Sequence, residues 1–263
     1  MHQPQTGYGD TVVDRTYHQP YRPSAHPELS RPAVVAGAVL LALVLVAFAV
    51  MVDRVAAARV EARTAEAFQD GMDTPQPPAV HVRGFPVLNQ LAAGTLRHVD
   101  ITAHDIPAQG AERPLPVSEL TLRLDDLRRS GSGSEARARS AEAIADLSYS
   151  DVSKALGVEV SQGTRSGQVT VAVQLPFGNE VTVTTGVSAA SGNRIAFKDF
   201  SVAGSALPAA GEELLNKAFD EPIQLRNIPA GLHLRTLTTT ATGLSARFSG
   251  RSVTFQPDHA GDV

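Results

Sequence analysis

The stretch His98-Val99-Asp100-Ile101-Thr102-Ala103-His104 alternates polar and apolar residues, and this pattern decides the fold class. Successive side chains of a strand point to opposite faces, so one face of this segment is apolar and the other is polar. Antiparallel sheets with one buried and one solvated face have this signature. The same period of two recurs at Leu120/Leu122/Leu124, Val169/Val171/Val173/Leu175, Val181/Val183, Leu244/Ala246/Phe248 and Val253/Phe255.

Turns and short helices interrupt these predicted strands. Glycine-containing turns are expected at Gly163 with Gly167, at 177–179, at 191–193 and at Gly243. Helical segments are expected at Val87–Ala93, at Ser150–Leu156 and at Pro208–Phe219. The second of these starts with a serine suited to capping a helix and stops at Gly157. The predicted class is therefore α+β, with an antiparallel sheet.

The N-terminal part follows a different pattern. Residues 1–30 are rich in Pro, His, Gln and Tyr and are predicted to be a disordered tail. Ala33–Val52 is an uncharged apolar run, and about 20 such residues span a hydrocarbon core of roughly 30 Å. The run is long for a signal peptide and follows a long polar tail, so a retained transmembrane anchor is the preferred interpretation. The Ala-rich segment 53–69 has good helix composition, and Gly71 is expected to end it.

This organisation predicts a single-pass plasma-membrane protein. Arginines are nearly balanced on the two sides of the run, so charge alone does not set the orientation. With one early anchor and the folded mass after it, we expect the tail inside and the domain outside the cytoplasm. The predicted domain covers 54–256, and residues 257–263 are predicted to be disordered.

Composition excludes several classes of function. The chain has no cysteine, which excludes disulfides, thiol catalysis and cysteine-ligated metal sites. Its formal net charge is -4, which argues against nucleic acid as a partner. Hydrophobic residues make up 43% of the chain, enough for a folded core.

Three segments carry a resemblance to a known family. The first is VHVRGFPVLNQLAAG at residues 80–94, a strand, a Gly-Phe-Pro turn and a short Leu-containing helix, followed by the strand at His98–Ile101. The second is LSYSDV at 147–152, and the third is IPAGLHL at 228–234. Their order and spacing resemble the LmeA-like phospholipid-binding family of actinobacterial cell-envelope proteins, over roughly residues 54–256. One departure is Val87, where the family has a second aromatic residue after Gly-Phe-Pro.

The resemblance implies a non-catalytic, extracytoplasmic phospholipid-binding domain that serves envelope lipid or lipoglycan metabolism. It also implies a curled antiparallel sheet packed with helices, similar to the tubular lipid-binding (TULIP, BPI-like) folds. The expected partners are phospholipid, with an inositol lipid as one candidate, the plasma membrane and envelope enzymes.

A lipid site needs an apolar lining and a few polar groups at its mouth. The candidate acyl-chain contacts are Phe85, Leu88, Leu91, Leu214, Leu215 and Phe219. Alanines at 136, 138, 141 and 143 would leave room for chains. Arginine suits phosphate oxygens, so Arg83 and Arg97, with Arg113, are head-group candidates, although each also reads as an ordinary surface arginine.

No catalytic motif is recognisable, and neither a cofactor nor a metal is expected. The chain lacks a Gly-x-Ser-x-Gly elbow, a phosphate loop, a dinucleotide fingerprint and a His-Glu-x-x-His motif. His98, Asp100 and His104 share one strand face, but their spacing is not a standard zinc pattern. The alternative to a lipid carrier is an envelope scaffold with a solid core that recruits partner enzymes. A lipid hydrolase or transferase is the third hypothesis.

Overall fold

The structure is a computed structural model of the 263-residue chain. It describes residues 31–108, 115–129, 135–174, 180–202, 209, 212–213, 215, 219 and 222–256. The predicted disordered tails, the turn at 177–179, Arg113 and Leu214 lie outside the described residues. The chain divides into two units, Met1–Ala47 and Phe48–Val263, and both sheets belong to the second unit.

Helix α1 (Arg31–Met72) joins the apolar run to the Ala-rich segment without a break. It passes through Gly71, which was expected to end it, because one glycine in the last turn costs a helix only about 1 kcal/mol. The large apolar side chains between Val39 and Val52 are exposed, whereas Ala57 is buried against the domain. By length and composition, the part of α1 within Val39–Met72 is able to cross a membrane, a property shared by anchors and signal sequences.

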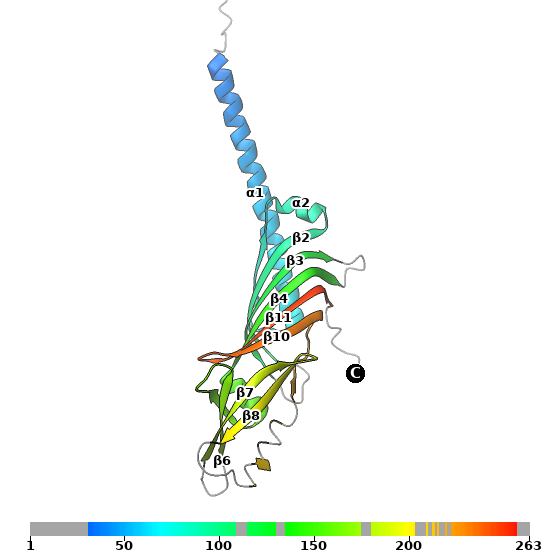
Figure 1. Ribbon diagram of the computed structural model, residues 1–263. Coiled ribbons are helices and arrows are strands. Elements are labelled where there is room, and N and C mark those ends of the chain that lie inside the picture. The colour runs from blue at the N-terminus through cyan, green and yellow to red at the C-terminus, as the bar shows by residue number, and fades with distance from the viewer. Residues whose placement is uncertain are drawn as a thin grey trace, which may run out of the picture. The chain divides into compact units, whose positions relative to one another are not determined.

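The larger sheet is six-stranded, antiparallel and curled into a half-barrel (Figure 1). Its strand order is β1-β2-β3-β4-β11-β10. The bounds are β1 (Ala79–Arg83), β2 (Thr95–Ile106), β3 (Val117–Arg129), β4 (Ala136–Ser148), β11 (Gly243–Phe255) and β10 (Ala230–Thr239). The short helix α2 (Val87–Ala92) connects β1 to β2, as the sequence predicted.

Left-handed residues interrupt three of these strands and help the sheet to curl. Asp105 in β2, Asp126 in β3 and Ser252 in β11 have φ of 52°, 48° and 51°. A left-handed residue within a strand bends and twists it locally, as at a β-bulge. In β11 the buried positions change from even to odd numbers after this point, from Phe248 to Val253. The two apolar stripes that the sequence shows there therefore belong to one strand.

The second sheet is five-stranded, with the order β5-β6-β7-β8-β9, and is also antiparallel. Its strands are β5 (Glu159–Gln162), β6 (Gln168–Gln174), β7 (Glu180–Ala190), β8 (Arg194–Val202) and β9 (Ile223–Gln224). Val169, Val171 and Val173 of the predicted apolar stripe are fully buried, whereas Leu175 lies outside the described residues. The buried side chains of both sheets belong to one hydrophobic cluster.

Helix α3 (Tyr149–Leu156) joins the two sheets and corrects one detail of the prediction. Its N-cap is Ser148, whose hydroxyl oxygen accepts a hydrogen bond from the Asp151 amide at 3.1 Å. The helix therefore begins one residue before Ser150, because the residue three positions after Ser148 completes the cap. Gly157 ends the helix with a φ of 70°, as predicted.

Candidate functional site

A cavity of about 230 Å³ lies on the concave face of the six-stranded sheet. The sheet forms one wall, the C-terminal end of α1 contributes Phe68 and Met72, and segment 224–229 lies across a third side. An apolar cavity of roughly 150 Å³ in another protein stays dry and binds benzene, so this space is large enough for an apolar ligand. The centre of the sheet wall is formed by Leu120, Leu122, Ala143, Ala145, Leu147, Ala246 and Phe248, and Ile106, Val117, Leu232 and Phe255 also contribute to it.

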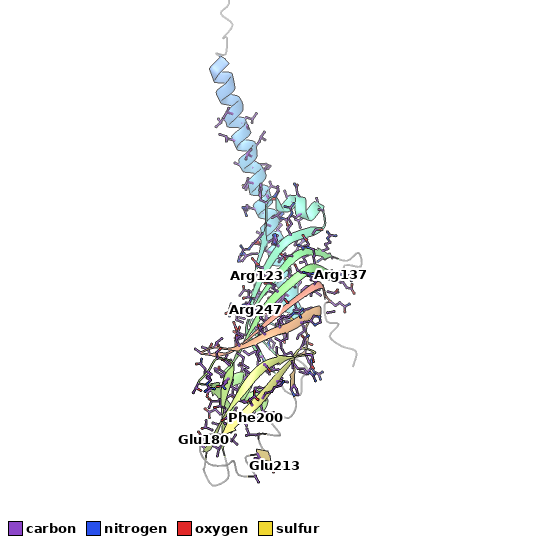
Figure 2. The ribbon with its side chains drawn as sticks, in the orientation of Figure 1. Arg123, Arg137, Glu180, Phe200, Glu213 and Arg247 are labelled. Atoms are coloured by element: carbon purple, nitrogen blue, oxygen red, sulfur yellow. The ribbon has the colours of Figure 1, made fainter. Side chains whose placement is uncertain are left out.

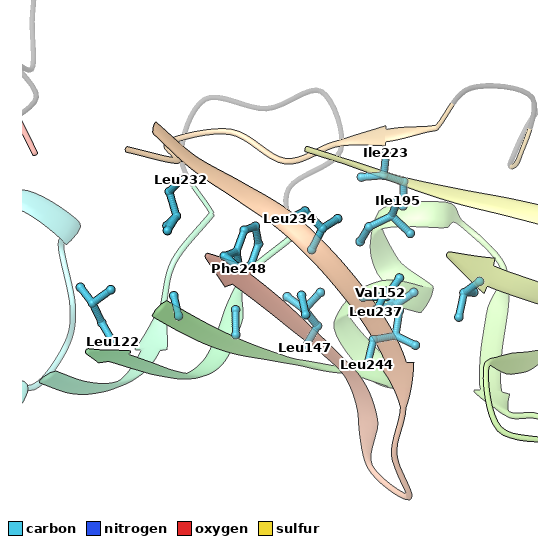
Figure 3. Close-up of a cluster of buried hydrophobic side chains, with 14 of the residues drawn as sticks. Leu122, Leu147, Val152, Ile195, Ile223, Leu232, Leu234, Leu237, Leu244 and Phe248 are labelled. Carbon is cyan, nitrogen blue, oxygen red and sulfur yellow. The ribbon is translucent and has the colours of Figure 1, made fainter. Parts of the chain in front are cut away.

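The cross-strand register makes this wall hollow. Leu120 of β3 faces Ala145 of β4, and Leu122 faces Ala143. On the other side of β4, Ala143 faces Phe248 of β11, while Ala145 faces Ala246. Ala143 thus lies between a leucine and a phenylalanine, and Ala145 lies between a leucine and a second alanine. Figure 3 shows Leu122, Leu147 and Phe248 on this wall, with Leu232 of β10 close by.

Among the described lining residues, the polar side chains lie in one segment. Gln224, Arg226 and Asn227 lie next to each other in segment 224–229. The Gln224 side-chain amide donates to the Gly192 carbonyl at 2.9 Å, which fastens the segment to the β7–β8 turn. Arg226 is exposed and has no ion-pair partner among the described residues. An apolar chamber with a free guanidinium at its edge has the chemistry to hold an acyl chain beside an anionic group.

The predicted contact residues lie elsewhere. Phe85, Leu88 and Leu91 sit on and next to α2, where they are 55%, 41% and 37% exposed, and none of them lines the cavity. Their role as lipid contacts stays a prediction. Among the alanines expected to leave room for chains, Ala143 lines the cavity, whereas Ala138 and Ala141 are buried outside it.

The second predicted group belongs to the core beside the five-stranded sheet. Leu215 and Phe219 are buried and helical. The Phe219 ring packs edge-on against Phe197 at 4.7 Å between centroids and against Phe200 at 5.5 Å. These contacts pack Phe219 into the core, and the role of Leu215 and Phe219 as lipid contacts stays a prediction.

The two described head-group candidates do not line the cavity either, and their head-group role stays a prediction. Arg83 of β1 forms an ion pair with Asp100 of β2, diagonally to its register partner His98. Arg97 is exposed, and its backbone amide donates to the Gln90 side chain at 2.8 Å. The sequence analysis did not name Arg226 as a head-group candidate. Its position between Leu225 and Ile228, just before the IPAGLHL segment, could have indicated one.

The histidine-containing face of β2 makes pairwise contacts. His98 Nδ1 lies 2.7 Å from Asp125 Oδ1, and Asp100 is bonded to Arg83. The Ser140 hydroxyl donates to Asp125 at 2.8 Å; this bond and the contact with His98 hold the pKa of Asp125 below its ordinary value. In the part of the chain that the structure describes, no three His, Asp or Glu side chains are grouped as metal ligands.

Comparison with known proteins identifies the family. The family model for LmeA-like phospholipid-binding proteins matches residues 51–249, so the chain belongs to this family, and the resemblance of the three sequence segments is confirmed. The family is a phospholipid-binding one and is not a known catalytic family. No curated protein matches the chain, and no solved structure matches it, so the likeness to tubular lipid-binding folds stays a prediction.

Proposed function

We propose that this protein is a membrane-anchored, extracytoplasmic carrier that holds a phospholipid by one acyl chain in the cavity of its half-barrel. The observation that carries the proposal is the apolar cavity between α1 and β3, β4 and β11, with Arg226 at its polar edge, in a member of a phospholipid-binding family. Holding or shuttling lipid in this way would serve envelope lipid or lipoglycan metabolism without catalysis.

The size of the cavity defines how the lipid would be held. Sites that enclose a whole drug-sized ligand have about 300–1,000 Å³, and this cavity has about 230 Å³. Part of one acyl chain fits inside, and the rest of the lipid lies outside, where Arg226 meets the phosphate. Burying apolar surface contributes roughly 25 cal/mol per Å², so even a partly enclosed chain gains several kcal/mol.

The proposed location outside the cytoplasm takes α1 as a retained anchor, with the folded domain on the far side of the membrane from the N-terminal tail. The apolar run of α1 would remain in the membrane as a single anchor, with the tail at 1–30 in the cytoplasm. The scaffold alternative assumes a solid core. A cavity on the concave face of the sheet favours the carrier over the scaffold.

A cavity-filling substitution tests this proposal. In Ala145→Phe a ring occupies the space between β3 and β11, and we expect the full-length protein purified in mild detergent to lose its phospholipid in native mass spectrometry. Ala138→Phe is the matched control, because Ala138 lies on the same strand and is buried outside the cavity. Overpacking there costs about 1–3 kcal/mol of stability and leaves lipid bound to the folded fraction.

The lipid content of the wild-type protein decides between the carrier and the scaffold. A wild-type protein without phospholipid after purification, and without uptake from liposomes of mixed anionic and zwitterionic lipids, would leave the scaffold as the better function. Equal lipid content in wild type and folded Ala145→Phe would place the lipid elsewhere on the molecule.

A further inference from the structure

Helix α2 buries Val87 and Gln90 and leaves both of its leucines exposed. Val87 and Gln90 are buried, at 2% and 5% exposure, whereas Leu88, Leu91 and the preceding Phe85 are exposed. A leucine or phenylalanine that stays in water lacks the roughly 1.5–3 kcal/mol of stabilisation that its burial would contribute. Three such side chains on one short element therefore form an apolar patch that lacks a covering surface within the described structure.

Hydrogen bonds from buried polar groups fix this orientation. The Gln90 side chain accepts from the Arg97 amide at 2.8 Å and donates to the Arg83 carbonyl at 3.3 Å, which ties α2 to β1 and β2. Asp53 of α1, 2% exposed, accepts from the Leu88 amide at 2.9 Å. Since α2 is held on two sides, rotating it to bury Leu88 and Leu91 would break all three bonds.

The hydrogen bond between the Leu88 amide and Asp53 fixes the position of α2 along the axis of α1. Asp53 is the first residue after the apolar run 33–52, so α2 lies where that run ends. Met51, Val52 and Val55 of α1 are also exposed there, at 59%, 37% and 43%. Exposed arginines accompany the patch: Arg54 follows Asp53, Arg83 precedes the Gly-Phe-Pro turn and Arg97 follows α2. Apolar side chains bordered by arginines match a boundary between acyl chains and phosphates.

We propose that α2 is a membrane-docking element, with Phe85, Leu88 and Leu91 inserted into the interface of the phospholipid leaflet at which the anchor ends. The occupant of the patch is thus the bilayer itself and not a single carried lipid. The docking rests on the anchor remaining in the membrane and does not depend on the cavity, so failure of one proposal leaves the other standing.

Fluorescence quenching by lipid tests the docking. The chain has no cysteine, so Leu88→Cys gives a single labelling site for an environment-sensitive nitrobenzoxadiazole probe on the full-length protein. In phosphatidylcholine–phosphatidylglycerol liposomes we expect blue-shifted emission and strong quenching by lipids that carry a nitroxide near the head of the acyl chain. Ser201→Cys is the matched control, since Ser201 is exposed in β8, and Figure 1 shows β8 far from α2.

A second variant separates insertion from an effect of the probe. Adding Leu91→Asp to Leu88→Cys leaves the buried anchors Gln90 and Asp53 in place and should reduce the quenching severalfold. Quenching at position 88 no greater than at position 201, or unchanged by Leu91→Asp, overturns the proposal. A blue-shifted probe that lipid nitroxides do not quench also overturns it, because a protein surface would then cover the patch.

Discussion

At the scale of single residues, Arg226 is the side chain that should select the lipid head group. We expect Arg226→Glu to lower the retained anionic phospholipid at least tenfold, because an interaction of about 1.4 kcal/mol or more with phosphate is replaced by repulsion. Arg226→Lys should keep most of the binding, since the positive charge remains. Lipid extraction and mass spectrometry of the purified full-length variants would measure both effects.

Arg247 provides the control for this substitution. It lies on β11 between the cavity residues Ala246 and Phe248, and alternation places it on the opposite, exposed face (Figure 2). Arg247→Glu changes the net charge equally and should leave lipid content unaltered. Equal losses in the two charge reversals would show a general electrostatic effect and count against a head-group role for Arg226.

Gly243 is required by close backbone packing at the start of β11. A β-carbon at this position would lie 1.8 Å from the carbonyl oxygen of Leu147, a backbone atom that cannot move aside freely. We expect Gly243→Ala to lower the free energy of unfolding by about 1–3 kcal/mol, as measured by urea denaturation in detergent.

Gly71→Ala is the matching control, because a β-carbon there meets nothing within 4 Å. It lies within α1, and helix propensity predicts a gain of up to about 1 kcal/mol. If both substitutions lowered the free energy of unfolding, the effect of the added methyl group would have a cause other than the contact with Leu147.

At the scale of secondary structure, the cap of α3 provides the clearest test. Ser148→Ala removes the oxygen that accepts the Asp151 amide, and caps of this kind contribute about 1 kcal/mol. Ser150→Ala alters an exposed serine two residues later and should change stability by less than about 0.5 kcal/mol. Urea midpoints followed by circular dichroism would decide between the two serines as the cap.

The same cap gives α3 a dependence on pH. The Ser148 hydroxyl donates to the Asp151 carboxylate at 2.7 Å, and this bond, with the contact to Lys154, keeps the pKa of Asp151 below its ordinary value. A lowered folded pKa stabilises the fold at pH values above the unfolded pKa of about 3.9, and the benefit is lost as pH falls below it. We expect the stability difference between wild type and Asp151→Asn to shrink from pH 6 to pH 3. A constant difference would show that the charge is unimportant.

At the scale of the whole molecule, the α+β class and several strands could be predicted because apolar residues of strong β propensity alternate in them. β2, β3, β6 and β7 show this alternation in their sequences and burial. β4 went unrecognised as a full strand, because its buried positions are mostly alanines, including Ala138, Ala141 and Ala143, which carry little β signal. Its place between β3 and β11 depends on long-range pairing.

The cavity could not be predicted for a related reason. It arises where alanines of β4 meet leucines of β3 and a phenylalanine of β11, and the register between β4 and β11 joins residues about 100 positions apart in the chain. The leucines of α2 were predicted to contact lipid because the helix is apolar in sequence. In the structure they face outward, since the hydrogen bonds of Gln90 and Asp53 hold the other side of the helix against the domain. The burial of a glutamine on an apolar helix depends on tertiary hydrogen bonds, which the periodicity of the sequence does not reveal.

The unbroken course of α1 makes it a spacer of defined length. From Asp53 to Phe68 it advances about 1.5 Å per residue, or roughly 22 Å along its axis. With the anchor in the bilayer, this separation exceeds the ~15 Å half-thickness of the hydrocarbon core, which is about the reach of one acyl chain. A lipid whose head group stays in the leaflet would then fall short of the chamber. Loading would require complete extraction of the lipid, and the protein would exchange cargo at a fixed height above the membrane.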